Sequence, residues 1–170
     1  MQKVYTCFCT DVIHEGHLNI IEQAGRYGRV IVGVLSDEAM IRFNRFATVS
    51  FKERLAMVEN IEGVDEVIIQ SEIMYDEVFE KLHPDYVIHG DNWKEGPEQI
   101  IRANVVGLLE KYGGELIEVP YTYNLHVRKV DSLMREKLAM PEFRRKRLRQ
   151  LIKFCPVVKT IEVHSGLSGL

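Results

Sequence analysis

The sequence predicts an α/β protein built on a Rossmann-like, doubly wound parallel sheet of five strands. Short apolar runs alternate with amphipathic helical patterns along the chain, and this alternation is typical of parallel strands joined by crossover helices. The 170 residues suit one such domain, and 46% hydrophobic residues suffice for its core. In these sheets, ligands bind at the carboxyl ends of the strands, near the position where the strand order reverses.

The five strands are expected where short apolar runs are bounded by turn residues. They are Val4 to Cys9, Val30 to Leu35, Val64 to Gln70, Tyr86 to His89, and Glu115 to Val119. The second run is apolar without interruption, which is typical of a central strand that is buried on both faces.

Helices are expected to begin at capping residues and to end at glycines. Ser36-Asp37 can cap a short helix, and Ser50 stands at the capping-box spacing from Glu53. Gly96-Pro97 can open the last of the core helices. The expected helices are 17–25, 36–42, 50–61, 76–82 and 96–112.

The chain is expected to divide into a core domain (1–135), a basic helical extension (136–155), and a linker or the start of a following domain (156–170). The extension carries Arg144-Arg145-Lys146-Arg147, Arg149 and Lys153. A solvated helix face or an arm that packs on a partner subunit is the favoured interpretation, ahead of an RNA or membrane contact. A net charge of −3 argues against a general nucleic-acid binder.

Cysteine content and hydropathy indicate a cytoplasmic protein. Cys7, Cys9 and Cys155 are odd in number, and the first two fall in an apolar strand without nearby metal-type partners, so we expect reduced core thiols. The start of the chain does not resemble a secretory signal, and no apolar run approaches the length of a membrane span.

The tetrapeptide His14-Glu15-Gly16-His17 lies where the first strand gives way to the first helix. Imidazoles at positions i and i+3 point the same way, and Gly16 lets a ligand approach the backbone closely. A helix start also offers unpaired N–H groups and positive partial charge. A lone histidine here would be a cap or surface residue, but this pair predicts a phosphate site.

The tetrapeptide resembles the His-x-Gly-His signature of the nucleotidyltransferase superfamily, and other blocks resemble its cytidylyltransferase members in the same order. Asp11 matches an acid ahead of the motif, while Thr10 stands where the family has an aromatic residue. Val30 to Asp37 resembles the second strand and its Ser-Asp turn, and Ser50 to Arg54 resembles a Tyr-x-x-Arg segment. His89-Gly90-Asp91-Asn92-Trp93 resembles the Gly-Asp-Asp/Asn-Trp loop.

The resemblance implies transfer of CMP from CTP to a phosphate or phosphonate anion, with release of pyrophosphate and Mg²⁺ as the cofactor. CTP is favoured by the Trp93 loop, and ATP stays open; Trp93 itself could equally be a core residue. A homodimer is implied as well. His14 and His17 would be the catalytic donors to the triphosphate, and the metal ligands stay unassigned. The implied nucleotide-binding residues are Thr10, Asp11, Gly16, His89, Gly90, Asp91, Trp93, Thr122 and Arg128.

The acceptor anion would be held by a basic residue after the second strand, either Arg42 or Arg45, with Tyr121 nearby. Lys52 and Arg54 are weaker candidates. The largest departure from the family follows Pro120, where an Arg-Thr-Glu-Gly-Ile-Ser-Ser-Thr-like signature is expected. There Thr122 fits, and Arg128 with its basic neighbours could supply positive charge in place of the missing hydroxyls.

The end of the chain suggests the acceptor. Ile161 to Ser168 resembles the opening of phosphoenolpyruvate mutase barrels, which implies a cytidylyltransferase fused to such a domain and a small phosphonate acceptor such as 2-aminoethylphosphonate. The segment could instead be an arm that swaps onto a partner subunit.

Alternative functions stay open. Glycerol 3-phosphate, phosphocholine or phosphoethanolamine could be the acceptor, or the chain could be a non-catalytic nucleotide-binding or assembly module. A class I aminoacyl-tRNA synthetase fragment is disfavoured, because no Lys-Met-Ser-Lys-Ser-like loop is present.

Overall fold

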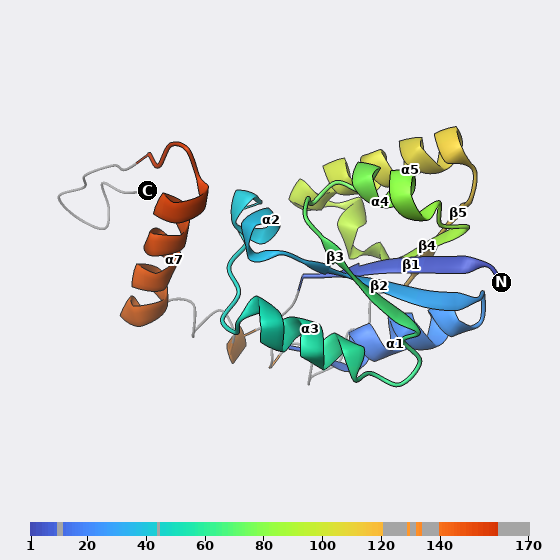
Figure 1. Cartoon of the computed structure of the whole chain (residues 1–170), viewed down its shortest axis with the longest axis horizontal. Helices are drawn as coiled ribbons and strands as arrows, with labels where there is room; N and C mark the ends of the chain where they lie inside the picture. Colours follow the sequence, from blue (N-terminus) through green and yellow to red (C-terminus); the bar gives the residue numbers. More distant parts are fainter. Residues whose placement is uncertain (10–11, 44, 121–128, 130–131, 134–139, 160–170) are drawn as a thin grey trace.

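The computed structural model describes residues 1–9, 12–43, 45–120, 129, 132–133 and 140–159. Its centre is a sheet of five parallel strands in the order β3-β2-β1-β4-β5, which confirms the predicted doubly wound fold (Figure 1). The strands are β1 (Lys3–Phe8), β2 (Arg29–Leu35), β3 (Glu66–Gln70), β4 (Tyr86–Gly90) and β5 (Glu115–Val119).

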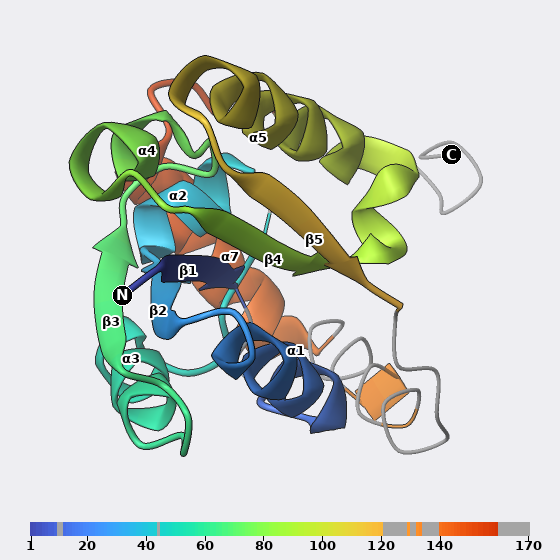
Figure 2. The same ribbon diagram turned by 90° about the vertical axis from the view of Figure 1, so that its right-hand side faces the viewer.

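Helices cover both faces of the sheet, so the molecule has three layers. Helices α1 and α3 lie on one face, and α4 and α5 lie on the other (Figure 2). The helices are α1 (Glu15–Gly25), α2 (Asp37–Arg42), α3 (Phe51–Glu59), α4 (Asp76–Leu82), α5 (Gln99–Tyr112) and α7 (Pro141–Phe154), with 3₁₀ turns η1 (Asp91–Lys94) and η2 (Gly96–Glu98).

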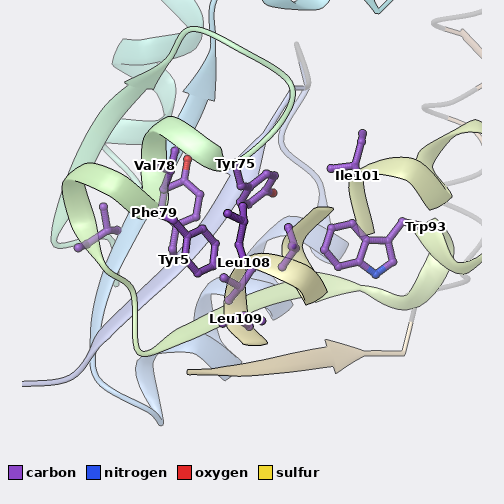
Figure 3. Packing of buried hydrophobic residues seen from close by; sticks show 11 residues of the cluster. Tyr5, Tyr75, Val78, Phe79, Trp93, Ile101, Leu108 and Leu109 are labelled. Carbon is purple, nitrogen blue, oxygen red and sulfur yellow. The ribbon is translucent and has the colours of Figure 1, made fainter. Parts of the chain in front are cut away.

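Each face of the sheet buries its own apolar cluster. Because successive strand residues point to opposite faces, Val4 packs toward α1 and α3, whereas Tyr5 packs toward α4 and α5. Figure 3 shows the second cluster, in which the rings of Tyr5 and Tyr75 meet edge to face at 5.6 Å. Trp93 lies beside Ile101 at one end of that cluster.

Side-chain caps start the helices where the sequence predicts them. Ser36 Oγ accepts from the Ala39 N–H at 3.1 Å, and Ser50 and Glu53 form the reciprocal capping box. Two predicted helix starts are wrong. Helix α1 begins at Glu15 because His14, not a later residue, is its N-cap, and α5 begins at Gln99 because Gly96, with φ +75°, cannot lie in the α-helical region.

The carboxyl ends of β1 and β4 separate, and this separation opens the sheet at its switch point. Strand β1 pairs with β2 along its whole length, from Lys3 to Phe8, but it pairs with β4 only at Val4 and Tyr5. From Thr6 onward the two central strands diverge. Thr6 is 1% exposed, and its hydroxyl has no hydrogen-bond partner among the described residues.

Helix α7 lies beside α2, away from the sheet (Figure 1). Lys146 Nζ donates to the Thr48 carbonyl at 3.3 Å, and the Arg147 guanidinium lies 4.1 Å from the centre of the Phe46 ring. The predicted basic extension therefore contains a helix, whereas the three-segment division stays a prediction. Within the described ranges, no helix is long and apolar enough to cross a bilayer.

The packing at Gly33 gives a stability prediction. A Cβ on Gly33 would overlap Tyr5 Oη, and that hydroxyl is held by Gln70 Oε1 at 2.5 Å. Gly33→Ala should therefore destabilise the fold by about 1–3 kcal/mol through overpacking, measured by urea unfolding. Gly107→Ala, on the exposed face of α5 with open space around it, is the control and should stabilise by about 0.5–1 kcal/mol. Equal stability of the two variants would contradict this account.

Candidate active site

A cavity of about 230 Å³ lies where β1 and β4 diverge. Its walls come from the ends of these strands, the start of α1, the segment after α2 and the turn η1. The polar side chains that line it are Thr6, His14, His17, Asn19, Tyr75, Arg45, His89, Asn92 and Glu98. The strand divergence thus brings together residues that are far apart in the sequence, as expected for a doubly wound sheet.

The paired histidines cap the helix that they begin. His14 Nδ1 accepts from the Gly16 N–H at 3.1 Å, and His17 Nδ1 accepts from the His14 N–H at 3.3 Å. The two residues therefore form a capping box of imidazoles, in which two backbone donors of the first turn are satisfied. In each ring a backbone N–H donates to Nδ1, so the lone pair lies on Nδ1 and the ring proton on Nε2.

His17 stays neutral over a wide pH range. Burial, together with the neighbouring His14 and His89, lowers the pKa of His17 to about 3. Its ring lies edge-on against Phe8 at 4.8 Å and 4.0 Å from the ring of His14. An apolar wall and a second imidazole therefore keep this ring as a neutral donor, not an imidazolium.

His89, at the end of β4, belongs to the opposite wall of the cavity. Its Nδ1 lies 2.8 Å from the Gly90 carbonyl oxygen, which can only accept, so Nδ1 carries the proton. The ring stacks on Trp93 at 3.8 Å with an interplanar angle of 8°. Trp93 is 1% exposed and lines the cavity, so it is both a core residue and a wall of the site.

Glu118, which no sequence motif marks, holds the indole nitrogen of Trp93, whose ring face stacks on His89. Its Oε1 accepts from Trp93 Nε1 at 2.8 Å and from Arg102 Nε at 2.9 Å, and Lys94 Nζ lies 3.1 Å from Oε2. The hydrogen bond from Arg102, then those from Trp93 and Lys94, lower the pKa of Glu118 to about 2 against the effect of burial. The available signal was an acid between the apolar residues Ile117 and Val119 of β5.

Arg45 and Arg42 occupy different places. Arg45 lines the cavity, where its Nη1 donates to Cys9 Sγ at 2.7 Å and its guanidinium pairs with Glu98. Arg42 is half-exposed and pairs with Glu38 and Glu72, each at 2.6 Å. It does not line the cavity, because the end of α2 turns its side chain to the surface. Of the two arginines expected to bind the acceptor, Arg45 therefore lies at the cavity and Arg42 does not.

The other predicted residues fall into three groups. Gly16 and Gly90 line the cavity, as predicted. Asp91 does not line it, but its neighbour Asn92 does. Arg54 is a structural residue, 1% exposed, that donates to the Leu35 carbonyl at 2.7 Å and to Asp37 Oδ1 at 2.6 Å. The predicted residues outside the described part of the chain are Thr10, Asp11, Tyr121, Thr122 and Arg128.

Cys7 and Cys9 line the cavity and pack, partly buried, against the core clusters, so the expected core thiols lie where the core meets the cavity. They follow the point where β1 leaves β4, so β4 does not cover them there. Burial raises the pKa of Cys7 well above its ordinary value. Among the described cysteines, Cys7, Cys9 and Cys155 are all free of disulfides.

The described side chains do not form a dedicated metal cage. Within these ranges, no cluster of three or more His, Cys, Asp or Glu side chains could hold an ion. Mg²⁺ commonly keeps several waters and is bound by one or two carboxylates together with substrate phosphates. The expected Mg²⁺ stays a prediction, and Asp11 lies outside the described residues.

The depressed pKa of His17 predicts a pH dependence of stability. The pKa is about 3 in the folded state and about 6.5 in the unfolded state, so the unfolded state binds the proton more tightly. The stabilisation is complete above pH 6.5 and is lost toward pH 3, with a slope of at most about 1.4 kcal/mol per pH unit. His17→Asn keeps an acceptor for the His14 N–H but cannot be protonated there.

The free energy of unfolding should therefore fall less between pH 7 and pH 5 in His17→Asn than in the unsubstituted protein, as measured by urea titration. His83→Asn is the control, because His83 is exposed and its left-handed backbone (φ 47°) suits asparagine. A decline as steep in His17→Asn as in the unsubstituted protein would contradict the burial of a neutral ring.

Residues 5–132 match the protein family described as cytidylyltransferase-like. The bifunctional protein HldE of Desulfatibacillum aliphaticivorans is 30% identical over 120 residues, which cover 69% of this chain and 24% of that protein. The ethanolamine-phosphate cytidylyltransferase of Arabidopsis thaliana is 36% identical over 96 residues, which cover 53% of this chain and 23% of that protein. The chain therefore spans about a quarter of the length of these curated relatives.

A solved structure supports the fold alone. The lipopolysaccharide core biosynthesis protein from Thermoplasma volcanium GSS1 superposes with a TM-score of 0.59 at 21% identity, covering 73% of this chain and 99% of that one. The family match extends from β1 through β5 and includes the paired histidines, the Trp93 loop and the diverging strands that make the cavity. The chain belongs to the cytidylyltransferase-like family, which confirms the predicted superfamily.

Proposed function

We propose that the chain is a cytidylyltransferase that moves CMP from CTP to 2-aminoethylphosphonate or a closely similar small phosphonate and releases pyrophosphate. The observation that carries the proposal is the pair of imidazoles of His14 and His17 at the start of α1, which line the cavity while backbone N–H groups hold their Nδ1 atoms. Their Nε2–H groups are the proposed donors. Donors of this kind, held in place before the reaction, stabilise charge that develops on phosphoryl oxygens.

The transfer needs no general base. An oxygen of the acceptor, already ionised at neutral pH, forms a bond to the α-phosphorus of CTP, and the bond from that phosphorus to the bridging oxygen breaks. The electron pair leaves with pyrophosphate. His14 and His17 donate hydrogen bonds to triphosphate oxygens near the breaking bond, and the cavity aligns the two anions.

Arg45 is the proposed partner of the acceptor anion. Glu98 orients its guanidinium within the cavity, and a guanidinium matches the geometry of a phosphoryl group. The ring of Tyr75 and the carboxylate of Glu98 also line this cavity and offer the aromatic and acidic surroundings that an ammonium group prefers.

Phosphoethanolamine is the second candidate acceptor. It differs from 2-aminoethylphosphonate only by an oxygen between carbon and phosphorus, so the same ammonium and anion contacts serve both. The relative from Arabidopsis thaliana, named for ethanolamine phosphate, favours this candidate. The resemblance of 161–168 to the opening of phosphoenolpyruvate mutase barrels favours the phosphonate, and these residues lie outside the described part of the chain. Mg²⁺ and a homodimer complete the proposal.

A pyrophosphate-release screen tests the function. CTP, ATP, UTP and GTP are each combined with 2-aminoethylphosphonate, phosphoethanolamine, phosphocholine and glycerol 3-phosphate in the presence of Mg²⁺. Turnover is expected with CTP and 2-aminoethylphosphonate. Turnover with ATP but not CTP would contradict the choice of base, and CTP binding without turnover on any acceptor would favour a non-catalytic module.

Loss of one imidazole donor should abolish most of the activity. His17→Ala is expected to lower kcat by about 100- to 1000-fold, with an unchanged far-UV circular dichroism spectrum. His17→Asn, which keeps the helix cap, separates the loss of the donor from any loosening of α1. A near-normal rate in both variants would remove the imidazoles from the mechanism, and His83→Asn is the exposed control.

Substitution of Arg45 and of Arg42 tests whether the acceptor binds in the cavity or at the surface beside α2. Arg45→Ala should raise the KM for the acceptor about tenfold or more, because it removes a charge-assisted contact. Arg42→Ala should leave that KM within about twofold, because Arg42 is paired at the surface. Steady-state kinetics at saturating CTP measure both, and the reverse order of effects would contradict the placement of the acceptor.

A further inference from the structure

Three residues form a continuous line of contacts from β5 to the cavity, and the proposed reaction assigns no task to this line. Glu118 holds the indole nitrogen of Trp93, and the indole face stacks on His89, which lines the cavity. Glu118 itself is not among the cavity-lining residues. Trp93 does line the cavity, so Glu118 can act on a ligand through the indole that it holds.

The Glu118 carboxylate is saturated with donors. Oε1 accepts from Trp93 and from Arg102 Nε, and Oε2 lies 3.2 Å from Arg102 Nη2 and 3.1 Å from Lys94 Nζ. The side chain is only 16% exposed, so water competes little for these bonds. Charge-assisted bonds of this kind fix orientation as well as add stability. The indole plane is thereby fixed relative to β5 and α5.

His89 differs from the other two cavity histidines in which ring nitrogen carries the proton. In His14 and His17 the backbone N–H groups occupy Nδ1, which leaves Nε2–H as a donor. In His89 the Gly90 carbonyl takes the Nδ1 proton, which leaves a lone pair on Nε2. Burial, the largest cause, and nearby Arg45 lower the pKa of His89, so the ring is neutral at neutral pH. Two histidines therefore offer donors, and the third offers an acceptor.

We propose that Glu118 is a positioning residue that, through Trp93, orients His89 so that its Nε2 accepts an N–H from an amino group of the bound substrate. The proposal rests on the proposed function of this cavity. A carbonyl oxygen or a methyl group at the same place would leave the lone pair of Nε2 unsatisfied, so such a substrate is disfavoured. The amino group belongs either to the nucleobase or to the acceptor substrate.

The array can be tested in the protein without ligand, because Trp93 is the single tryptophan of the chain. A protonated imidazole stacked on an indole quenches its fluorescence, whereas a neutral one quenches weakly. The charged and titratable groups around His89 are His17 on α1, Arg45 after α2 and Glu118 on β5. Emission should stay constant from pH 8 to below the ordinary histidine pKa of about 6.5 and fall only at lower pH.

His89→Phe keeps an aromatic ring against Trp93 and should remove that fall in emission. A midpoint at or above pH 6.5, or the same fall in His89→Phe, would overturn the assignment of a neutral stacked ring. Glu118→Ala should increase the quenching of Trp93 fluorescence by acrylamide and raise the KM of the substrate that His89 contacts. Glu118→Gln keeps an acceptor for the indole N–H, so it should change the quenching and the KM less. Glu115→Ala, an exposed carboxylate of the same strand, is the control. Equal effects of Glu118→Ala and Glu115→Ala would overturn the positioning role.

Paired substrates identify the amino group. CTP is compared with UTP, which has a carbonyl in place of the amine, and 2-aminoethylphosphonate is compared with propylphosphonate, which has a methyl group there. In His89→Phe, one of the two preferences should fall about tenfold or more, corresponding to one lost hydrogen bond. A fall in the first ratio assigns the nucleobase, and a fall in the second assigns the acceptor. If His89→Phe leaves both the preference for CTP over UTP and the preference for 2-aminoethylphosphonate over propylphosphonate unchanged, the proposal is overturned.

The two proposals fail in different ways. Binding of CTP and UTP, and of the two phosphonates, is also measured by Trp93 emission without turnover. Absence of pyrophosphate release therefore contradicts the proposed reaction alone, whereas unchanged binding preferences in His89→Phe contradict the role of His89 alone.

Discussion

The early separation of β1 from β4 is the constraint on which the rest of the site depends. The two central strands pair only at Val4 and Tyr5, although β1 continues to Phe8 beside β2. Helices leave these strands toward opposite faces of the sheet, so nothing in the sheet itself fills the space between their ends. The start of α1 and the turn η1 after β4 then both border that space. Residues separated by some seventy positions in the sequence become opposite walls of one cavity.

Electrostatics in this cavity is set by burial and by backbone groups more than by formal charge. His17 is desolvated and lies against a second imidazole, which keeps it neutral. The backbone group that contacts Nδ1 then decides which nitrogen of each ring carries the proton. In His14 and His17 this group is an N–H, so the proton lies on Nε2, whereas in His89 it is a carbonyl oxygen, so the proton lies on Nδ1. Formal charge enters through the Arg45–Glu98 pair. The site is therefore a set of oriented dipoles next to one ion pair, an arrangement that suits phosphoryl transfer.

Local sequence signals were sufficient for most of the fold and for placing the paired histidines where the first helix begins. The bounds of β5 and α4 agree with the predicted runs, since turn residues border both, and the caps at Ser36 and Ser50 follow from side-chain chemistry alone. The start of α1 was misplaced because histidine is an unusual N-cap.

The rest depended on contacts between distant segments, which no local pattern contains. Arg42 and Arg45 are indistinguishable in sequence, and the end of α2 decides which one reaches the cavity. Glu118 lacks a motif, and its role follows from three donors that come from η1 and α5. Cys7 and Cys9 are expected in the core because their run is apolar, and only the loss of pairing with β4 explains why they also line the cavity.

The self-capping of α1 has a consequence for the thermodynamics of ligand capture. His14 and His17 satisfy the first turn of the helix with one edge of each ring, and the opposite edges keep their orientation before any anion arrives. The helix start is thus preorganised: association does not have to immobilise these side chains or melt a competing loop. The entropic cost of fixing rotamers, about 0.5–1.5 kcal/mol for each ordered side chain, is met during folding, and more of the intrinsic interaction energy is retained as affinity.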